Sequence, residues 1–567
     1  MADDVTQASD KAQPPPWAAG TDDRMHELDP ALTEDEIALV RRYGEETTYK
    51  AGTWLWRTGE RAVGLFLVLD GELDVVAQRD GAEQHIITHS AGHYAGETTS
   101  MIARGALVDG RAKTDLHVLE VSSQRLREMI ALEAELGEKI FLSFILRRMR
   151  LIAEDQGDIT LYGVAEEAET ARVRTFLSRQ GIPFAFRDLG DDGNQSRLDA
   201  LGHAPQDRPV VSSDRLTLVK PSIRALAEEL GIAATIKPDQ TYDLVVAGGG
   251  PGGLAAAVYG ASEGLSVLVV ESLAPGGQAA TSSRIENFFG FPTGISGQAL
   301  TGRGFLQASK FGAEVASARR IETITCGAPH TLTLDGGDTV RAKSIVIASG
   351  AEYRTPPIEG LDRFTGGGVH YGASHLEAQL CKKRDIAIVG GGNSAGQAAI
   401  FLAGHARRVH ILIRGESLAS SMSSYLIERI EQTENIDVLP FTEVAEVCGE
   451  QSLQSLKLRD NRTDETRMAD IAHLFIFIGA VPANAFLPPD VTQDKKGFVL
   501  TGTDLTADQL TAAGWELERA PGPLETSCPG IFAVGDIRSG SVKRVASAVG
   551  EGSVCVSEVH QFIAGLA

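Results

Sequence analysis

The chain has 567 residues, too many for one hydrophobic core, and this length predicts three or four domains. Its formal net charge of −23 at pH 7 argues against nucleic acid as a partner, because the two would repel each other. The sequence contains no apolar run of about 18 residues to span a bilayer, and residues 1–20 carry acids and prolines in place of a signal peptide. We therefore expect a cytoplasmic protein that binds neither nucleic acid nor membrane.

The five cysteines are scattered along the chain, as Cys326, Cys381, Cys448, Cys528 and Cys555. They form no Cys-x-x-Cys pair and no spacing typical of zinc ligands. The sequence therefore predicts neither a structural disulfide nor a metal site.

The N-terminal quarter of the chain changes pattern twice. Residues 1–25 are polar and rich in proline, which predicts a flexible arm. A helix is expected over residues 33–42, and residues 54–120 form short alternating runs punctuated by glycine, which is typical of a small antiparallel barrel. Helical periodicity returns over residues 123–154.

Residues 26–155 resemble a cyclic nucleotide-binding domain, on the strength of Gly59-Glu60, Gly64 to Gly71 and Tyr94 to Glu97. In that family the glutamate at the position of Glu97 holds the ribose, and an arginine nine residues later pairs with the cyclic phosphate. Ala106 stands at the arginine position here. Because the phosphate would lose its charge-assisted partner, we expect an inert or partner-binding barrel, with a cyclic-nucleotide sensor as the alternative.

A compact mixed unit follows, over residues 156–236. Strands are predicted at 159–162 and 183–189 and helices at 168–180 and 222–230, which resembles a thioredoxin or glutaredoxin domain. The two cysteines of that family fall on Glu167 and Thr170, so we expect a docking or spacer module without redox chemistry. The resemblance also predicts a cis peptide bond before Pro209.

From Tyr242 onward strands and helices alternate, and two glycine-rich turns stand out. Each turn follows a strand and opens a helix, so its amides can hold a diphosphate at the helix N-terminus. The first turn contains Gly248, Gly250, Pro251 and Gly253, and the second contains Gly390, Gly392, Asn393, Ser394 and Ala395. The fold class predicted is α/β, with two doubly wound dinucleotide-binding domains behind the barrel and the mixed unit.

The strand after the first turn ends at Glu271, where a carboxylate can accept hydrogen bonds from an adenosine ribose. The motifs that follow are Gly276-Gly277-Gln278, residues 284–292 with Asn287, residues 345–350 and residues 530–536. Together these segments, over about residues 241–567, strongly resemble the low-molecular-weight thioredoxin reductase family. The resemblance implies an FAD domain at 241–354 and 480–567, an NAD(P)H domain at 355–479, and a homodimer.

The resemblance also implies which residues contact each dinucleotide. The FAD contacts expected are Gly248, Gly250, Pro251, Gly253, Glu271, Gly277, Gln278, Asn287, Gly350, Gly535, Asp536, Lys543, Arg544 and Val545. The family usually has Arg-Gln-Ala at the last three positions, so Lys543 and Arg544 are either cations near the flavin or surface charges. On the nicotinamide side, Arg414 is the one arginine left to pair with the 2′-phosphate of NADPH. NADPH is favoured, and Glu416 leaves NADH open.

The redox cysteines of the family are missing. The family has Cys-x-x-Cys where this chain has Gly372-Ala373-Ser374-His375. His375 could donate a proton near the flavin or could be a polar loop residue. Cys381, nearby in sequence, could be a redox thiol or an ordinary packing residue.

We therefore expect an NAD(P)H-dependent FAD oxidoreductase that passes hydride to the flavin and electrons onward to an unidentified protein, quinone or oxygen. A first alternative is a thioredoxin-disulfide reductase that uses Cys381 or a partner thiol. A second alternative is a redox or cyclic-nucleotide sensor in which the flavin is only a reporter.

Overall fold

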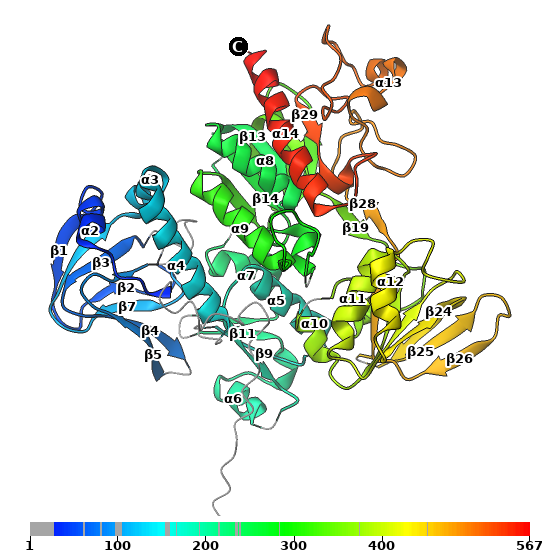
Figure 1. Ribbon diagram of the computed structural model, residues 1–567, viewed down its shortest axis with the longest axis horizontal. Coiled ribbons are helices and arrows are strands. Elements are labelled where there is room, and N and C mark those ends of the chain that lie inside the picture. Colours follow the sequence, from blue (N-terminus) through cyan, green and yellow to red (C-terminus); the bar gives the residue numbers. More distant parts are fainter. Residues whose placement is uncertain are drawn as a thin grey trace, which may run out of the picture. The chain divides into compact units, whose positions relative to one another are not determined.

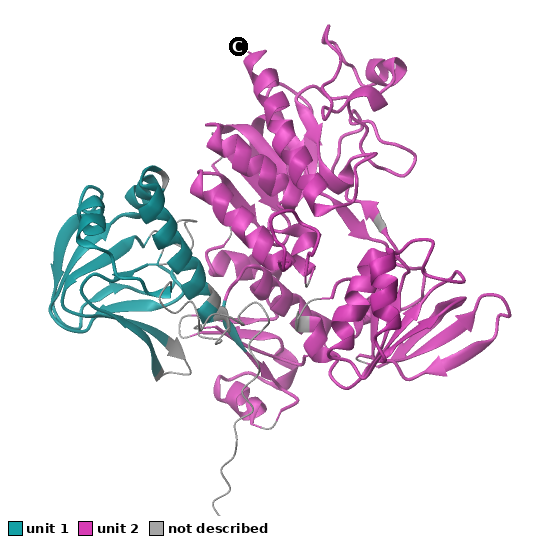
Figure 2. Cartoon of the chain, viewed as in Figure 1, with its two compact units in different colours: residues 1–100, 106–158, 183–185 teal, residues 101–105, 159–182, 186–567 magenta. Residues whose placement is uncertain are grey.

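The structure is a computed structural model, in which the chain forms two compact units (Figures 1 and 2). Unit 1 comprises residues 1–100, 106–158 and 183–185, and unit 2 comprises the remainder. The structure describes residues 28–60, 63–79, 82–96, 105–153, 159–165, 167–191, 193–213, 216–232, 236–237, 240–282, 284–373, 375–450 and 452–566. The arm predicted at 1–25 and the ribose-binding position Glu97 lie outside these residues.

The described residues of unit 1 form two four-stranded sheets and three helices. Thr33 caps α2 through a capping box with Glu36, which fixes where this helix begins. The sheets have the orders β1-β8-β3-β6 and β2-β7-β4-β5, and Trp56 stacks on Phe66 in the core between them. The elements are α2 (Glu34–Val40), β1 (Glu45–Tyr49), β2 (Trp54–Trp56), β3 (Leu65–Asp70), β4 (Leu73–Arg79), β5 (Ala82–His89), β6 (Tyr94–Ala95), β7 (Asp109–Ala112), β8 (Leu116–Val121), α3 (Ser123–Leu132) and α4 (Ala134–Ala153).

Unit 2 begins with a small module, residues 159–232, whose sheet has the order β10-β9-β11-β12. Its elements are β9 (Ile159–Gly163), α5 (Ala168–Arg179), β10 (Phe184–Asp188), α6 (Asn194–Ala200), β11 (Val210–Ser212), β12 (Thr217–Val219) and α7 (Ile223–Glu229). The sequence predicts β9, α5, β10 and α7, whereas α6 lies in a stretch for which it predicts no element. The bond between Arg208 and Pro209 is cis, which confirms that expectation.

The next part of unit 2 is a seven-stranded sheet. Its strands come from the segment that follows the small module and from the C-terminal segment of the chain. The order is β15-β14-β13-β18-β17-β16, and β29 pairs in parallel with β18. Helices α8 and α14 pack together over one face (Figure 1). The elements are β13 (Thr241–Ala247), α8 (Pro251–Ser262), β14 (Val267–Glu271), η4 (Gly277–Thr281), α9 (Gly297–Lys310), β15 (Glu314–Ser317), β16 (Ile321–Thr325), β17 (His330–Leu334), β18 (Thr339–Ile347), η6 (Gly502–Asp504), α13 (Ala507–Ala512), β29 (Ile531–Ala533), η7 (Gly535–Ile537) and α14 (Val545–Ala564).

A second parallel sheet, of order β20-β27-β21-β22-β23, is inserted into this part. The chain enters and leaves the insertion through β19 and β28, which pair antiparallel. The elements are β19 (Ala351–Tyr353), η5 (Leu361–Phe364), β20 (Val369–His370), α10 (His375–Leu380), β21 (Asp385–Val389), α11 (Asn393–Ala403), β22 (Arg408–Leu412), α12 (Ser424–Glu431), β23 (Ile436–Leu439), β24 (Thr442–Gly449), β25 (Leu453–Asp460), β26 (Thr466–Ala469), β27 (His473–Ile476) and β28 (Ala480–Pro482).

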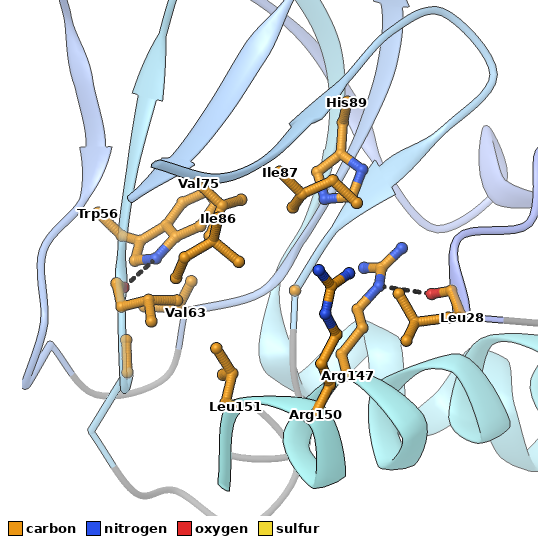
Figure 3. A pocket seen from close by; sticks show the side chains of 13 residues that line it. Leu28, Trp56, Val63, Val75, Ile86, Ile87, His89, Arg147, Arg150 and Leu151 are labelled. Atoms are coloured by element: carbon orange, nitrogen blue, oxygen red, sulfur yellow. Dashed lines mark hydrogen bonds between the residues drawn. The ribbon is translucent and has the colours of Figure 1, made fainter. Parts of the chain in front are cut away.

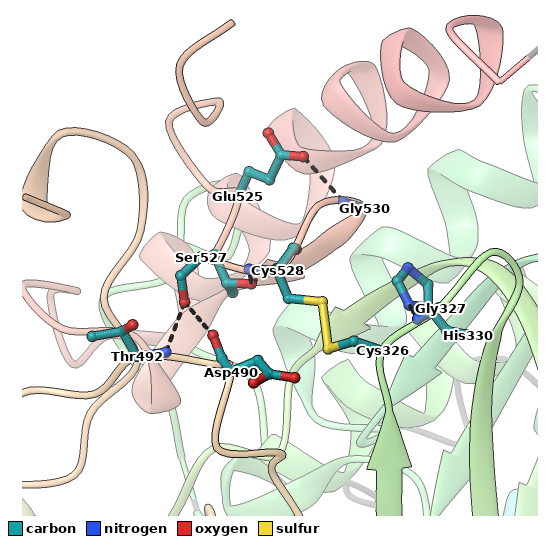
Figure 4. Close-up of a disulfide and its surroundings, with 10 residues drawn as sticks. Cys326, Gly327, His330, Asp490, Thr492, Glu525, Ser527, Cys528 and Gly530 are labelled. Atoms are coloured by element: carbon teal, nitrogen blue, oxygen red, sulfur yellow. Dashed lines mark hydrogen bonds between the residues drawn. A yellow bond between two sulfur atoms is a disulfide. The ribbon is translucent and has the colours of Figure 1, made fainter. Parts of the chain in front are cut away.

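The expectation of no disulfide is wrong. Cys326, after β16, and Cys528, before β29, form a disulfide in the core under the seven-stranded sheet (Figure 4). The two residues are 202 positions apart, and the inserted second sheet lies between them in the sequence. Spacing along the chain therefore could not indicate that they meet.

The sequence predicts neither a membrane-spanning helix nor a metal site. None of the helices in its described parts combines the length and the apolar character needed for a membrane crossing. The described residues also contain no cluster of three or more potential metal ligands.

Candidate functional site

The first glycine turn joins β13 to α8 at the carboxyl end of the parallel sheet. Gly248 has a φ of +112°, and a Cβ there would lie 2.5 Å from the carbonyl oxygen of Ala348. A Cβ on Gly253 would overlap the carbonyl oxygen of Gly248, so the helix can approach the strand only without a side chain. Gly250 is the N-cap of α8, Pro251 is its first residue, and a Cβ on Gly250 would meet no atom within 4 Å. The turn is thus tightly packed behind and open in front, which fits a diphosphate.

Glu271 lies beside this turn, at the carboxyl end of β14. Its side chain is buried and accepts hydrogen bonds from the backbone N–H groups of Gly249, at 2.7 Å, and Leu273, at 3.0 Å. Because a carboxylate has several acceptor positions, Glu271 can keep these bonds and still accept from a ribose hydroxyl.

Four further predicted FAD residues follow β14 and β18. Gly277 opens η4 with a φ of +54°, and a Cβ there would lie 3.0 Å from the Cα of Gly250. The Gln278 side chain donates to the carbonyl of Ala351, which ties η4 to β19. Gly350 has a φ of +70° just after β18, and Asn287 is exposed between η4 and α9.

The C-terminal FAD residues reach the same edge of the sheet because β29 runs parallel to β18. The N–H of Gly535 donates to Glu551 at 2.6 Å, and burial raises the pKa of the neighbouring Asp536 carboxyl, against the opposing effect of Lys543. Lys543 Nζ donates to the Asp536 carbonyl at 2.5 Å, and burial lowers the pKa of this ammonium group. Arg544 is the exposed N-cap of α14, and Val545 is its first residue.

The second glycine turn repeats this construction between β21 and α11. Gly390 has a φ of +136°, and a Cβ there would overlap the carbonyl oxygen of Phe477. Gly392 is the N-cap of α11, and Ala395 is fully buried against the strand. Asn393 accepts from the Ser423 N–H at 2.8 Å. Ser394 is exposed in the first turn of the helix.

Arg414 follows β22, the strand next to β21, and is exposed. The Asn461 side chain donates to its carbonyl at 3.0 Å, which fixes the backbone and leaves the guanidinium on the surface. Glu416 is exposed two residues later. The placement of Arg414 at this edge of the sheet suits a group that binds the adenosine end of a nucleotide.

The two candidates near the missing dithiol differ in how far the structure describes them. Cys381 follows α10 and is fully buried in the core around β21 and α11. Burial raises the pKa of its thiol to about 12, and Glu377 adds to the effect. The thiol is therefore neutral and shielded, as expected of a packing residue. His375 is the first residue of α10, and its side chain lies outside the described atoms.

Unit 1 contains a cavity of about 60 Å³ between the sheets and α4 (Figure 3). Most of its lining is apolar, including Trp56, Ile87 and Leu151. Two arginines of α4, Arg147 and Arg150, also line it. The Arg147 guanidinium donates to the carbonyls of Leu28 and Tyr94 and to Asp29, so it is engaged by the protein itself.

Comparisons with known proteins agree with this geometry. Residues 242–552 match the family described as pyridine nucleotide-disulphide oxidoreductase, and residues 46–133 match the cyclic nucleotide-binding domain. The chain is 30% identical over 327 residues to a thioredoxin reductase of Listeria innocua, which covers 57% of this chain and 95% of the relative. It is 32% identical over 326 residues to that of Treponema pallidum, covering 57% of this chain and 97% of the relative.

Solved structures show the same likeness. The thioredoxin reductase of Lactococcus lactis superposes with a TM-score of 0.51 at 27% identity, over 57% of this chain and all of that one. The enzyme of T. acidophilum gives the same TM-score at 25% identity, over 58% of this chain and all of that one. The chain therefore belongs to the pyridine nucleotide-disulphide oxidoreductase family, as an NAD(P)H-dependent flavoprotein oxidoreductase that uses FAD and NADPH and carries a cyclic nucleotide-binding domain in front.

Proposed function

We propose that this protein oxidises NADPH and delivers the electrons from FAD to an acceptor outside its own chain, without an internal dithiol. The observation that carries the proposal is the segment Gly372 to His375, which lacks both cysteines, in a sequence with no Cys-x-x-Cys pair. Disulfide exchange needs an attacking thiolate and a second thiol to resolve the mixed disulfide. With neither present at this position, the acceptor has to meet the flavin itself, as a redox protein, a quinone or oxygen.

The residues of the first turn would hold FAD. The amides at the N-terminus of α8 would bind the diphosphate, and Glu271 would accept from the adenosine ribose. When bound, FAD supplies a two-electron centre that takes hydride from the nicotinamide. Lys543 lies at 2.5 Å from the Asp536 carbonyl, on the segment expected beside the flavin ring, where a positive charge stabilises added negative charge.

The second turn would hold NADPH. Backbone amides at the N-terminus of α11 face its diphosphate, and Arg414 is the proposed partner of its 2′-phosphate. We also propose that two copies of the chain form a homodimer and that the protein works in the cytoplasm, as its relatives' fold and the sequence suggest.

The alternative of a disulfide reductase centred on Cys381 loses support from the site. A thiol with a pKa of about 12 is almost fully protonated at neutral pH and cannot attack a disulfide at a useful rate. The sensor alternative loses support from the barrel, because Ala106 stands at the position of the phosphate-binding arginine and Arg147 already binds Asp29. We propose that the barrel binds neither cAMP nor cGMP, and calorimetry with a measurable heat of binding for either nucleotide would contradict this.

A steady-state assay separates the proposal from the disulfide reductase. NADPH oxidation is measured with ferricyanide or a soluble quinone, and in parallel with thioredoxin and insulin. We expect turnover with the first acceptors and none with thioredoxin, in both the parent protein and Cys381→Ser. Thioredoxin reduction that disappears in Cys381→Ser would establish the alternative instead.

A further inference from the structure

The C-terminal end of α5, in the module of residues 159–232, contacts the part of the chain that forms the first dinucleotide site. The side chain of Gln180, which is 4% exposed, donates from Nε2 to the carbonyl of Leu273 at 2.9 Å. Two residues earlier, the carbonyl of Ser178 accepts from Gln298 Nε2, in the first turn of α9, at 3.0 Å. Two hydrogen bonds therefore join one helix end to two neighbouring segments.

Leu273 belongs to a loop, residues 272–276, that connects two proposed FAD residues, Glu271 and Gly277. The loop is already tied to the first glycine turn, because the Gly276 N–H donates to the Gly249 carbonyl at 2.7 Å and the Leu273 N–H donates to Glu271. The bond from Gln180 engages the other side of Leu273. The conformation of this loop thus depends on α5 as well as on its own domain.

Arg179, which precedes Gln180 in the sequence, carries a positive charge at the same end of α5. This guanidinium is half-buried, and the ionisable groups that act on it are Glu271, Tyr353 and Glu377. Burial lowers the pKa of Arg179, and these groups oppose the effect. An arginine guanidinium keeps its proton in proteins, so the side chain is a cation. Glu271 ends β14, Tyr353 ends β19 and Glu377 lies in α10. The Arg179 guanidinium therefore interacts with elements of both proposed dinucleotide-binding parts.

A second contact holds the module in this position. Arg224, in α7, donates to the carbonyl of Asp335 at 3.1 Å, at the turn between β17 and β18. A Cβ on the adjacent Gly336 would overlap the Arg224 guanidinium, so the turn is shaped to admit it. The module is therefore anchored at two separate points on the seven-stranded part.

We propose that α5 is a working part of the FAD site: Gln180 holds the loop of residues 272–276 in its binding conformation, and Arg179 places a positive charge beside Glu271, at the adenosine and diphosphate end of the cofactor. The inference rests on the FAD site proposed above. A loop that is ordered before binding spares FAD the entropic cost of ordering it, and a nearby cation favours the two negative charges of the diphosphate. Gln180 and Arg179 are positioning residues, and the module is more than a spacer.

The test compares variants of the full chain after removal of FAD. Gln180→Ala removes the bond to Leu273, Arg179→Gln removes the charge, and Arg179→Lys keeps it. Arg172→Gln is the matched control, because this arginine lies on the exposed side of α5 and contacts Glu169 and the Pro221 carbonyl within its own module. The readouts are the FAD dissociation constant, from flavin fluorescence, and hydrogen exchange of the amides of residues 272–276 in the FAD-free protein.

We expect Gln180→Ala and Arg179→Gln each to raise the FAD dissociation constant about tenfold, the size of one hydrogen bond to a charged group or of a lost loop restraint. Gln180→Ala also speeds exchange in residues 272–276, whereas Arg179→Lys and Arg172→Gln stay close to the parent. Parent-like FAD affinity in both Gln180→Ala and Arg179→Gln would overturn the inference. If the parent itself fails to bind FAD, the proposed function fails with it, so the two failures are distinguishable.

Discussion

We expect the preference for NADPH over NADH to depend on Arg414. This residue is exposed just after β22, and Ile413, Gly415 and Ala419 stand where the resemblance to thioredoxin reductases implies the other phosphate-binding residues. An arginine that pairs with a phosphate contributes a charge-assisted hydrogen bond, and no second guanidinium stands at these positions to replace it.

Substitution of Arg414 by alanine should therefore raise the KM for NADPH about tenfold to a hundredfold and leave the KM for NADH nearly unchanged. Initial rates of ferricyanide reduction with each nucleotide measure the effect. Glu416→Gln is the control, since it changes a neighbouring charge and removes no donor. An equal rise in both KM values for Arg414→Ala would show that the residue does not read the 2′-phosphate.

The reactivity of each cysteine thiol in this chain depends on how deeply the thiol is buried. Cys381 and Cys555 are both fully buried, and burial raises the pKa of each thiol. Proximity of Cys381 to the missing dithiol in the sequence suggested a redox role, but that role depends on exposure and a low pKa, and neither can be read from sequence spacing.

Among the structural elements, β20 and β27 carry a buried histidine pair. His370 Nε2 lies 3.1 Å from His473 Nδ1, and burial lowers the pKa of His370 to about 4 from its usual 6.5. Because the unfolded chain binds a proton near pH 6.5 and the folded chain does not, stability falls as the pH drops from about 6.5 toward 4.

The thermal unfolding midpoint of the protein should therefore decrease over this pH range, and less steeply in His370→Asn, whose side chain does not titrate. The free energy involved is about 3 kcal/mol for a shift of this size. His85→Asn, at an exposed histidine of the barrel, is the control. A pH dependence in His370→Asn as steep as in the parent would rule out this histidine as its source.

The disulfide between Cys326 and Cys528 joins the end of β16 to the segment before β29. It closes a loop of about 200 residues, for which chain entropy alone gives a stabilisation of about 5 kcal/mol, against about 2–4 kcal/mol for a typical disulfide. Reduction, or the double substitution of both cysteines by serine, should lower the unfolding midpoint, whereas Cys448→Ser should not.

Alkylation of the denatured protein checks the bond directly. Three cysteines should react without a reductant, Cys381, Cys448 and Cys555, and all five after reduction. Five reactive cysteines without reduction would show that the bond is not formed.

The elements that the sequence predicted well are those whose pattern is local. The glycine turns predict β13-α8 and β21-α11, because only glycine fits so close to a neighbouring carbonyl. The spacing of the apolar residues predicts α5. The short, polar α6 and the polar strand β1 carry no such period and were not predicted. The disulfide and the contact of Gln180 with Leu273 join segments far apart in sequence, so no pattern along the chain could have indicated them.

For the whole molecule, the number of electrons that each subunit can store distinguishes a chain without the dithiol from a relative that has it. A relative with a dithiol next to FAD stores two electron pairs per subunit, whereas a chain without it stores one pair, on the flavin alone. The disulfide between Cys326 and Cys528 does not change this expectation, because it precedes β29, whereas the proposed FAD residues Gly535 and Asp536 follow that strand.

An anaerobic titration of the FAD-bound protein tests this most directly. The flavin absorbance is followed as NADPH is added, and then as dithionite is added to a second sample. We predict that one equivalent of either reductant per flavin bleaches the protein completely and that no further equivalent is consumed, in the parent and in the variant with both Cys326 and Cys528 replaced by serine. A flavin that NADPH does not bleach, or a second equivalent consumed by that serine variant, would contradict the account.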